Sequence, residues 1–185
     1  MALKIIGLLI VLIGVVVYYY MNHFSSTAIL KNATTRNGYS LDIREEPIEI
    51  ELFVKQEWIP FDSDKPMNLN VKLCEKNNTD IILTEVWNRG NDIYFIFDTS
   101  YHLNYKNGEF LYNGFFNEDG TFTSNSNIND FSVYNLENEP IYLGQKGFGP
   151  NSSFSFGIQS EEYDKIRNGF YIKYSGMILY SYSLY

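Results

Sequence analysis

Residues 48–54 have the sequence IEIELFV, with an apolar side chain at every second position. Successive side chains of an extended chain point to opposite faces, so this alternation predicts a β-strand with one buried face. Residues 69–73 repeat the alternation, and residues 81–87 form a further strand-like run. The apolar run at 93–97 is continuous, which is typical of a strand in the middle of a sheet.

Turn-forming residues separate these runs. The polar segments that favour turns are residues 60–66, 77–80 and 88–91. Asn107-Gly108 is the strongest hairpin signal and is expected to join residues 101–105 to 109–112. A second hairpin is expected to turn at Asp119-Gly120.

The C-terminal third shows the same pattern. Its predicted elements are strands at 131–136 and 153–158, a loop at 147–150, a helical turn at 161–166, and a last strand pair at 170–174 and 178–182. Ser175-Gly176 is expected to be the turn of that pair. About eight to ten strands with a spacing of roughly 8–12 residues predict an all-β antiparallel sandwich or barrel.

The N-terminal segment has a different composition. Residues 5–21 are an unbroken apolar or aromatic run that ends in Tyr18, Tyr19 and Tyr20. Such a run is long enough to cross a bilayer core of about 30 Å, and the tyrosines would lie at the lipid–water boundary. We therefore expect residues 1–24 to form a transmembrane signal-anchor helix that binds the membrane through residues 5–21.

Two alternatives for this segment remain. Ser26-Thr27-Ala28 resembles the exit of a cleaved signal peptide, although the run is longer than such peptides need. A buried core helix would usually have a polar face. Lys4 favours an N-terminus on the inside and an extracytoplasmic C-terminal domain, whereas Lys31 and Arg36 flank the other side.

The rest of the chain divides into two parts. Residues 25–38 are polar and are expected to form a juxtamembrane linker, followed by one β domain at 39–185. The net charge is −8, and every acidic residue lies at or beyond Asp42. An acidic domain without a basic stripe argues against nucleic-acid binding, which needs Lys and Arg to neutralise phosphates.

Few residues carry the chemistry of an active site. Cys74 is the single cysteine and is expected to pack as a small apolar side chain in a strand. His23 and His102 are the two histidines. A zinc site needs three or four His or Cys ligands, and the β domain offers only His102 and Cys74. A histidine base needs a neighbouring nucleophile, and His102 is expected to be a surface residue instead. No catalytic, cofactor-binding or metal-binding residue is assigned.

Three weaker patterns also occur in the sequence. Asp62, Asp64 and the segment Asn125–Asp130 place oxygen atoms at alternate positions, as calcium sites do, but these residues also favour turns. Glu45, Glu46, Glu49 and Glu51 form an acidic edge, where outward charges protect an edge strand. The glycosylation triplets begin at Asn32, Asn77 and Asn151.

The order of signals in residues 48–174 resembles a bacterial immunoglobulin-like module. The segment 73–81 ends in Asn-Asn-Thr-Asp-Ile, a long aromatic strand follows, and residues 112–114 supply an aromatic-x-Gly strand. A Gly-Pro-Asn-Ser loop precedes the closing segment 163–172. This order is similar to intracellular proteinase inhibitor (BsuPI-type) domains and to the sandwich that precedes aspzincin catalytic domains. The resemblance implies an immunoglobulin-like β-sandwich and an association with peptidases, and it transfers no functional residue.

Two function classes follow. The first is a membrane-anchored, non-catalytic binding or accessory domain with a protein partner, such as an envelope protein or a peptidase. The second is a carboxylate-dependent hydrolase acting on glycans, since two acidic residues can suffice for that chemistry. The first is preferred because the chain lacks a recognisable catalytic set, and no cofactor is expected.

Overall fold

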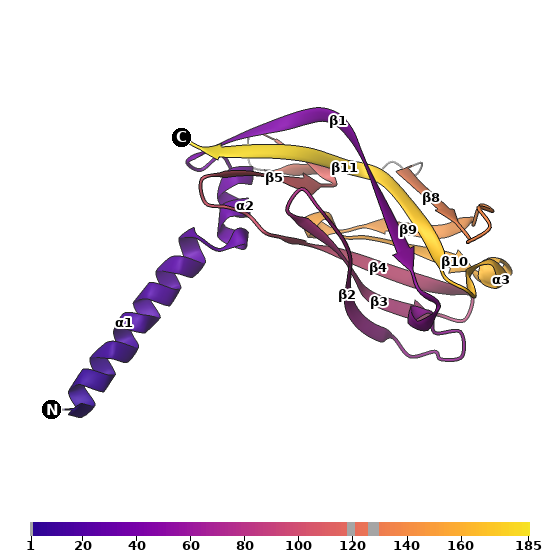
Figure 1. The fold of residues 1–185 in the computed structure, drawn as a ribbon, viewed down its shortest axis with the longest axis horizontal. Helices are drawn as coiled ribbons and strands as arrows, with labels where there is room; N and C mark the ends of the chain where they lie inside the picture. The colour runs from indigo at the N-terminus through magenta and orange to yellow at the C-terminus, as the bar shows by residue number, and fades with distance from the viewer. Residues whose placement is uncertain (1, 118–120, 126–129) are drawn as a thin grey trace.

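The computed structural model describes residues 2–117, 121–125 and 130–185. Two helices come first, α1 (Ala2–His23) and α2 (Ser26–Thr34), and antiparallel β-sheets make up most of the remainder. Figure 1 shows α1 projecting away from the β region, with α2 lying between them. The expected architecture of one N-terminal apolar helix and an antiparallel β domain is confirmed at this level.

One sheet is built around the C-terminal strand. β11 (Phe170–Leu184) pairs along its length with β1 (Tyr39–Val54). It also pairs with β8 (Phe131–Tyr134) in its first half and with β5 (Asn107–Tyr112) in its second half. All of these pairings are antiparallel.

The second sheet has five strands in the order β2-β3-β4-β10-β9. Their bounds are β2 (Met67–Lys76), β3 (Thr79–Asn88), β4 (Asp92–Tyr101), β10 (Phe154–Gln159) and β9 (Leu143–Phe148). Asn77 and Asn78 turn the chain between β2 and β3 with φ of 47° and 55°, a conformation that asparagine tolerates. β4 lies in the middle of the sheet, as its continuous apolar run predicts.

Short elements complete the β region. They are β6 (Gly114–Phe116), β7 (Phe122–Ser124), α3 (Tyr163–Ile166) and the 3₁₀ turns η1 (Gln56–Trp58), η3 (Pro150–Ser152) and η4 (Ser160–Glu162). β6 and β7 pair antiparallel, while the expected turn at Asp119-Gly120 lies outside the described residues. The helical turn predicted at 161–166 is confirmed by η4 and α3.

The main core lies between the two sheets, because each sheet turns one apolar face inward. It includes Ile50, Leu52 and Ile172 from the first sheet and Leu83, Phe95 and Phe156 from the second. Full burial of a side chain of this size contributes roughly 1.5–3 kcal/mol. The strand with one buried face predicted at residues 48–54 is therefore confirmed, since Ile50 and Leu52 are buried and Glu49 and Glu51 are exposed.

A second, tyrosine-rich core lies where the first sheet extends beyond the second. α2 covers this extension, and its Ile29 and Ala33 are fully buried, at 0% exposure. The helix begins at Ser25, whose hydroxyl accepts a hydrogen bond from the Ala28 amide at 3.2 Å. Residues 25–38, expected as a polar juxtamembrane linker, therefore include a helix that packs on the β domain, because the spacing of Ile29 and Ala33 places both on one helical face.

Three turn predictions are wrong. Asn107-Gly108 lies inside β5, which pairs with β11 rather than β4. Ser175-Gly176 lies inside β11, at a register shift opposite β1. Gly147 and Phe148, predicted as loop, end strand β9.

The two misplaced glycines have a common physical cause. A Cβ on Gly108 would lie 2.7 Å from the Tyr182 hydroxyl oxygen, and one on Gly176 would lie 2.5 Å from the Tyr174 ring. These glycines therefore give buried tyrosines room against the backbone, and do not form turns.

Candidate functional site

Helix α1 has an apolar surface that the β domain leaves uncovered. Residues 5–23 are long and apolar enough to cross a membrane, and none of this stretch is buried within the protein. Isolated exposed apolar residues are common, but a continuous apolar cylinder requires a lipid or protein environment. The described chain thus has one helix suited to single-pass anchoring.

The junction between α1 and α2 is only two residues long. Phe24 donates its amide to Tyr20 O at 2.8 Å, and the Ser25 hydroxyl donates to Met21 O at 2.6 Å, so both residues stay attached to the end of α1. The Phe24 ring packs on Tyr105, with 4.6 Å between centroids. The end of α1 therefore contacts a loop that is distant in sequence.

That loop is the crossover segment, residues 102–106, which carries the chain from β4 in one sheet to β5 in the other. Each of its five residues makes a hydrogen bond through its backbone to another part of the chain. The contacts are His102 N to Asn78 O, Leu103 N to Ser26 Oγ, Tyr182 Oη to Asn104 O, Tyr39 Oη to Tyr105 O, and Leu184 N to Lys106 O. The partners come from α2, from the β2–β3 turn and from strands β1 and β11. The crossover segment thus links the α1–α2 junction to both sheets.

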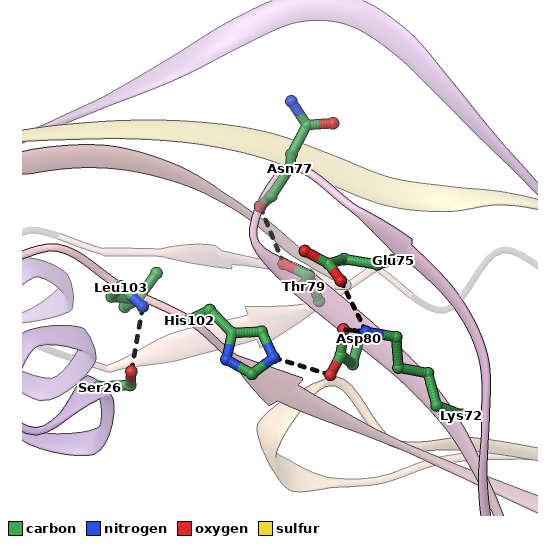
Figure 2. A network of polar contacts seen from close by, with 8 residues as sticks. All are labelled: Ser26, Lys72, Glu75, Asn77, Thr79, Asp80, His102 and Leu103. Atoms are coloured by element: carbon green, nitrogen blue, oxygen red, sulfur yellow. Dashed lines mark hydrogen bonds and ion pairs between the residues drawn. The ribbon is translucent and has the colours of Figure 1, made fainter.

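A polar network fixes the start of this segment (Figure 2). The mostly buried Asp80 carboxylate lies 2.8 Å from His102 Nε2 and 2.9 Å from Lys72 Nζ. Lys72 also contacts Glu75 at 2.6 Å. Asp80 comes directly after the β2–β3 turn, so the network fastens that hairpin to the crossover segment.

Electrostatics favour the charged form of Asp80. Burial raises the pKa of its carboxyl, but hydrogen bonds and electrostatic attraction from His102 and Lys72 outweigh burial, so the pKa lies below the ordinary value. Lys72 is correspondingly held positive, since its hydrogen bonds to Glu75 and Asp80 raise its pKa. This is a stable ion-pair cluster.

The Asp80–His102 pair resembles the carboxylate and histidine of a catalytic triad. The His102 side chain is 57% exposed, and a buried carboxylate orients its ring. A triad also needs a nucleophile, and within the described residues no hydroxyl or thiol hydrogen-bonds to His102. The arrangement supports positioning of the loop better than nucleophilic catalysis.

The other sequence candidates lie apart from this network. Cys74 lies in β2 and packs against the main core, and burial raises the pKa of its thiol. His23 ends α1, with its ring 4.5 Å from Tyr19. Among the described residues, no three His, Cys, Asp or Glu side chains gather as metal ligands would.

The calcium-like residues are divided between two loops. Asp62 and Asp64 precede β2, and the Asp64 carbonyl accepts a hydrogen bond from Trp87 Nε1 at 2.9 Å. Asn125 donates to Gly176 O at 3.1 Å, while Asn127 and Asn129 lie outside the described residues. The described residues of the two segments thus make hydrogen bonds in separate loops, in keeping with the preference of Asp and Asn for turns.

The acidic edge lies on the outer face of β1. Glu49 and Glu51 both face Lys173 of β11, at 3.9 and 3.7 Å, while the side chains of Glu45 and Glu46 lie outside the described residues. Beside them, Phe53, Tyr171 and Tyr134 form an aromatic row across three strands, with centroid separations of 4.8 and 5.6 Å. This aromatic row is half-exposed.

The three glycosylation triplets occupy different settings. Asn32 lies in α2, Asn77 in the β2–β3 turn, where its amide donates to Glu109 at 3.1 Å, and Asn151 in η3. Their modification is untested.

Sequence reasoning missed the crossover segment and Asp80. The sequence places Asp80 in an expected turn and Tyr105 in an expected hairpin strand. Their partners are distant in sequence, so no local pattern indicates the contacts.

No family model, curated protein or solved structure shows significant similarity to this chain. Functional inference therefore depends on the geometry described above.

Proposed function

We propose that this chain is a membrane-anchored, non-catalytic binding or accessory domain, with an immunoglobulin-like β-sandwich that α1 holds at the membrane surface. The observation that carries the proposal is the uncovered apolar helix α1, joined through two residues to a helix that is packed into the β domain. A short connection of this kind would hold the surface of the β domain in a fixed orientation relative to the membrane. The N-terminus lies inside, and the domain is extracytoplasmic.

The aromatic row is the surface proposed to contact a protein partner, such as an envelope protein or a peptidase. Tyrosine and phenylalanine are enriched at protein interfaces because they bury large areas at low entropic cost. Glu49, Glu51 and Lys173 border the row and give it a charged rim. The row lies on the first half of β11, and β11 begins at the end of the β region that is far from α1 in Figure 1.

The test is photocrosslinking in native membranes. A photoreactive phenylalanine analogue replaces Tyr134 and, in a matched control, the exposed Phe115 of β6. A discrete adduct is expected from position 134 and not from position 115, and Tyr171→Ala should weaken it because it removes the central ring of the row. Equal labelling from both positions, or none from 134, argues against this surface.

One observation favours glycan hydrolysis as a second candidate. Asp42 and Glu109 both lie opposite Ser181, on the two strands that flank β11, and line one hollow of about 380 Å³. Adjacent strands lie about 4.8 Å apart, so the two backbones are about 10 Å apart. For comparison, the two carboxyl groups of inverting glycosidases are about 6.5–9.5 Å apart. Tyr182 is the aromatic residue in the lining, and the remaining lining residues other than Gly108 are polar or charged. Glycan cleavage that disappears in Asp42→Asn would favour this candidate.

A further inference from the structure

The crossover segment and the helix junction form one exposed aromatic surface at the end of α1. Tyr20 and Phe24 lie one helical turn apart, with 6.2 Å between their ring centroids, and Tyr105 continues the series from another part of the chain. Tyr105 is 40% exposed and Phe24 is 37% exposed. Aromatic side chains with a polar tip gather at the boundary between lipid and water, which is where α1 would leave the bilayer.

The charge around this surface differs from that of the rest of the domain. Residues 22–41 and 102–108 contain no acidic residue, although the whole chain carries 22. The exposed Lys31 of α2 and Lys106 of the crossover segment belong to these two stretches. A lysine near an anionic membrane surface is attracted to the lipid phosphates.

The surface is also held in a fixed shape. The Tyr105 carbonyl accepts a hydrogen bond from Tyr39 Oη at 2.7 Å, and the Leu103 amide donates to Ser26 Oγ at 3.0 Å. Since Ser26 begins the helix that follows the junction, Tyr105 cannot move away from α1 without breaking these contacts. An aromatic residue fixed in this place pays little ordering entropy when it enters an interface.

We infer that the crossover segment is a membrane-docking loop, which inserts Tyr105 beside Phe24 into the headgroup region of the bilayer that α1 spans. Lys31 and Lys106 face the phosphates of anionic lipids. The domain thus docks end-on through a small basic surface, which keeps its acidic bulk away from the membrane. This inference rests on the proposed anchoring by α1 and adds a second contact with the same membrane.

The experiment uses the full chain in vesicles with Cys74→Ala, so that a nitroxide attaches only to an introduced cysteine. Labels are placed by Tyr105→Cys, by Asn104→Cys as a second position on the segment, by Val16→Cys within α1, and by Tyr142→Cys as a control. Tyr142 is 71% exposed and lies against Lys165 of α3, at the opposite end of the β region from α1 (Figure 1). Accessibility to oxygen, which enriches in lipid, is compared with accessibility to a water-soluble nickel chelate.

The expected oxygen-to-nickel ratio at positions 104 and 105 is several-fold higher than at 142. It should rise further when phosphatidylcholine vesicles are replaced by an equal mixture with phosphatidylglycerol. The double variant Lys31→Glu, Lys106→Glu should lose that rise, and an unchanged rise overturns the role of the two lysines. A label at 105 that is as water-accessible as the label at 142 overturns the docking loop. If the label at position 16 is lipid-exposed in that case, α1 anchors the protein without a second membrane contact. A water-exposed label at position 16 overturns the anchoring by α1 as well.

Discussion

The mostly buried Asp80 carboxylate lies between Lys72 and His102, and both side chains stabilise its charge. Asp80→Asn keeps the shape but removes the charge that holds His102 and Lys72. Weakening charged hydrogen bonds at a buried position costs roughly 1–3 kcal/mol. Denaturant unfolding of the full chain in detergent should show a loss of this size. Asp164→Asn is the matched control, because Asp164 pairs with Arg167 at a fully solvated site, where little change is expected.

The charge of Asp80 also makes the stability of the fold depend on pH. The folded-state pKa of Asp80 is depressed below its ordinary value of 3.8, so its stabilising contribution is present above that pH. As the pH falls below about 3.8, the contribution is lost through protonation of the folded form. The stability difference between wild type and Asp80→Asn should therefore shrink in acid, and a constant difference would contradict the role of this charge.

At the scale of elements, a substitution at Gly176 tests whether residues 170–184 form one long strand, in which Tyr174 packs on the Gly176 backbone. An alanine there would overlap the Tyr174 ring, which cannot yield because it stacks on Phe131 at 4.4 Å. Overpacking of this kind costs about 1–3 kcal/mol. Thermal unfolding should show this loss for Gly176→Ala and almost none for Gly144→Ala, where the nearest atoms belong to the Gln159 side chain. A tolerated Gly176→Ala would contradict this close packing of Tyr174 on the backbone.

The elements show which parts of a fold local patterns can predict. Residues 48–54 and 93–97 were predicted correctly, because alternation and continuous apolarity report directly on which faces are buried. Gly108 and Gly176 misled the prediction, because a glycine that makes room for a distant tyrosine looks the same as a glycine in a turn. The segment at 25–38 looked polar because only two of its positions, Ile29 and Ala33, are fully buried by packing.

The candidate site was less predictable for a related reason. Asp80 and His102 are 22 residues apart, and Tyr105 contacts Phe24 across an even longer stretch of chain. Local patterns report which side chains are buried, but they do not report which strands become neighbours. The crossover segment becomes a link only when both sheets and α2 are assembled around it.

For the whole molecule, packing around α2 determines whether the anchor and the β domain move together. Ile29 is fully buried against the tyrosine-rich core, and Ile29→Ala removes packing worth about 2–5 kcal/mol. We expect this loss to loosen α2, and with it the angle between α1 and the domain. Nitroxides at positions 16 and 142, in the Cys74→Ala chain, report that angle as a distance distribution.

That distribution should be narrow in the parent chain and in Thr27→Ala, an exposed position on the same helix, and broad in Ile29→Ala. A rigid joint is needed if the aromatic row is to face a partner at a fixed height and direction above the membrane. If the parent chain already gives a broad distribution, α1 is a flexible tether, and the row must find its partner by diffusion around the anchor. If Ile29→Ala stays narrow, the hydrogen bonds of the crossover segment and the contact between Phe24 and Tyr105 hold the domain without α2 packing.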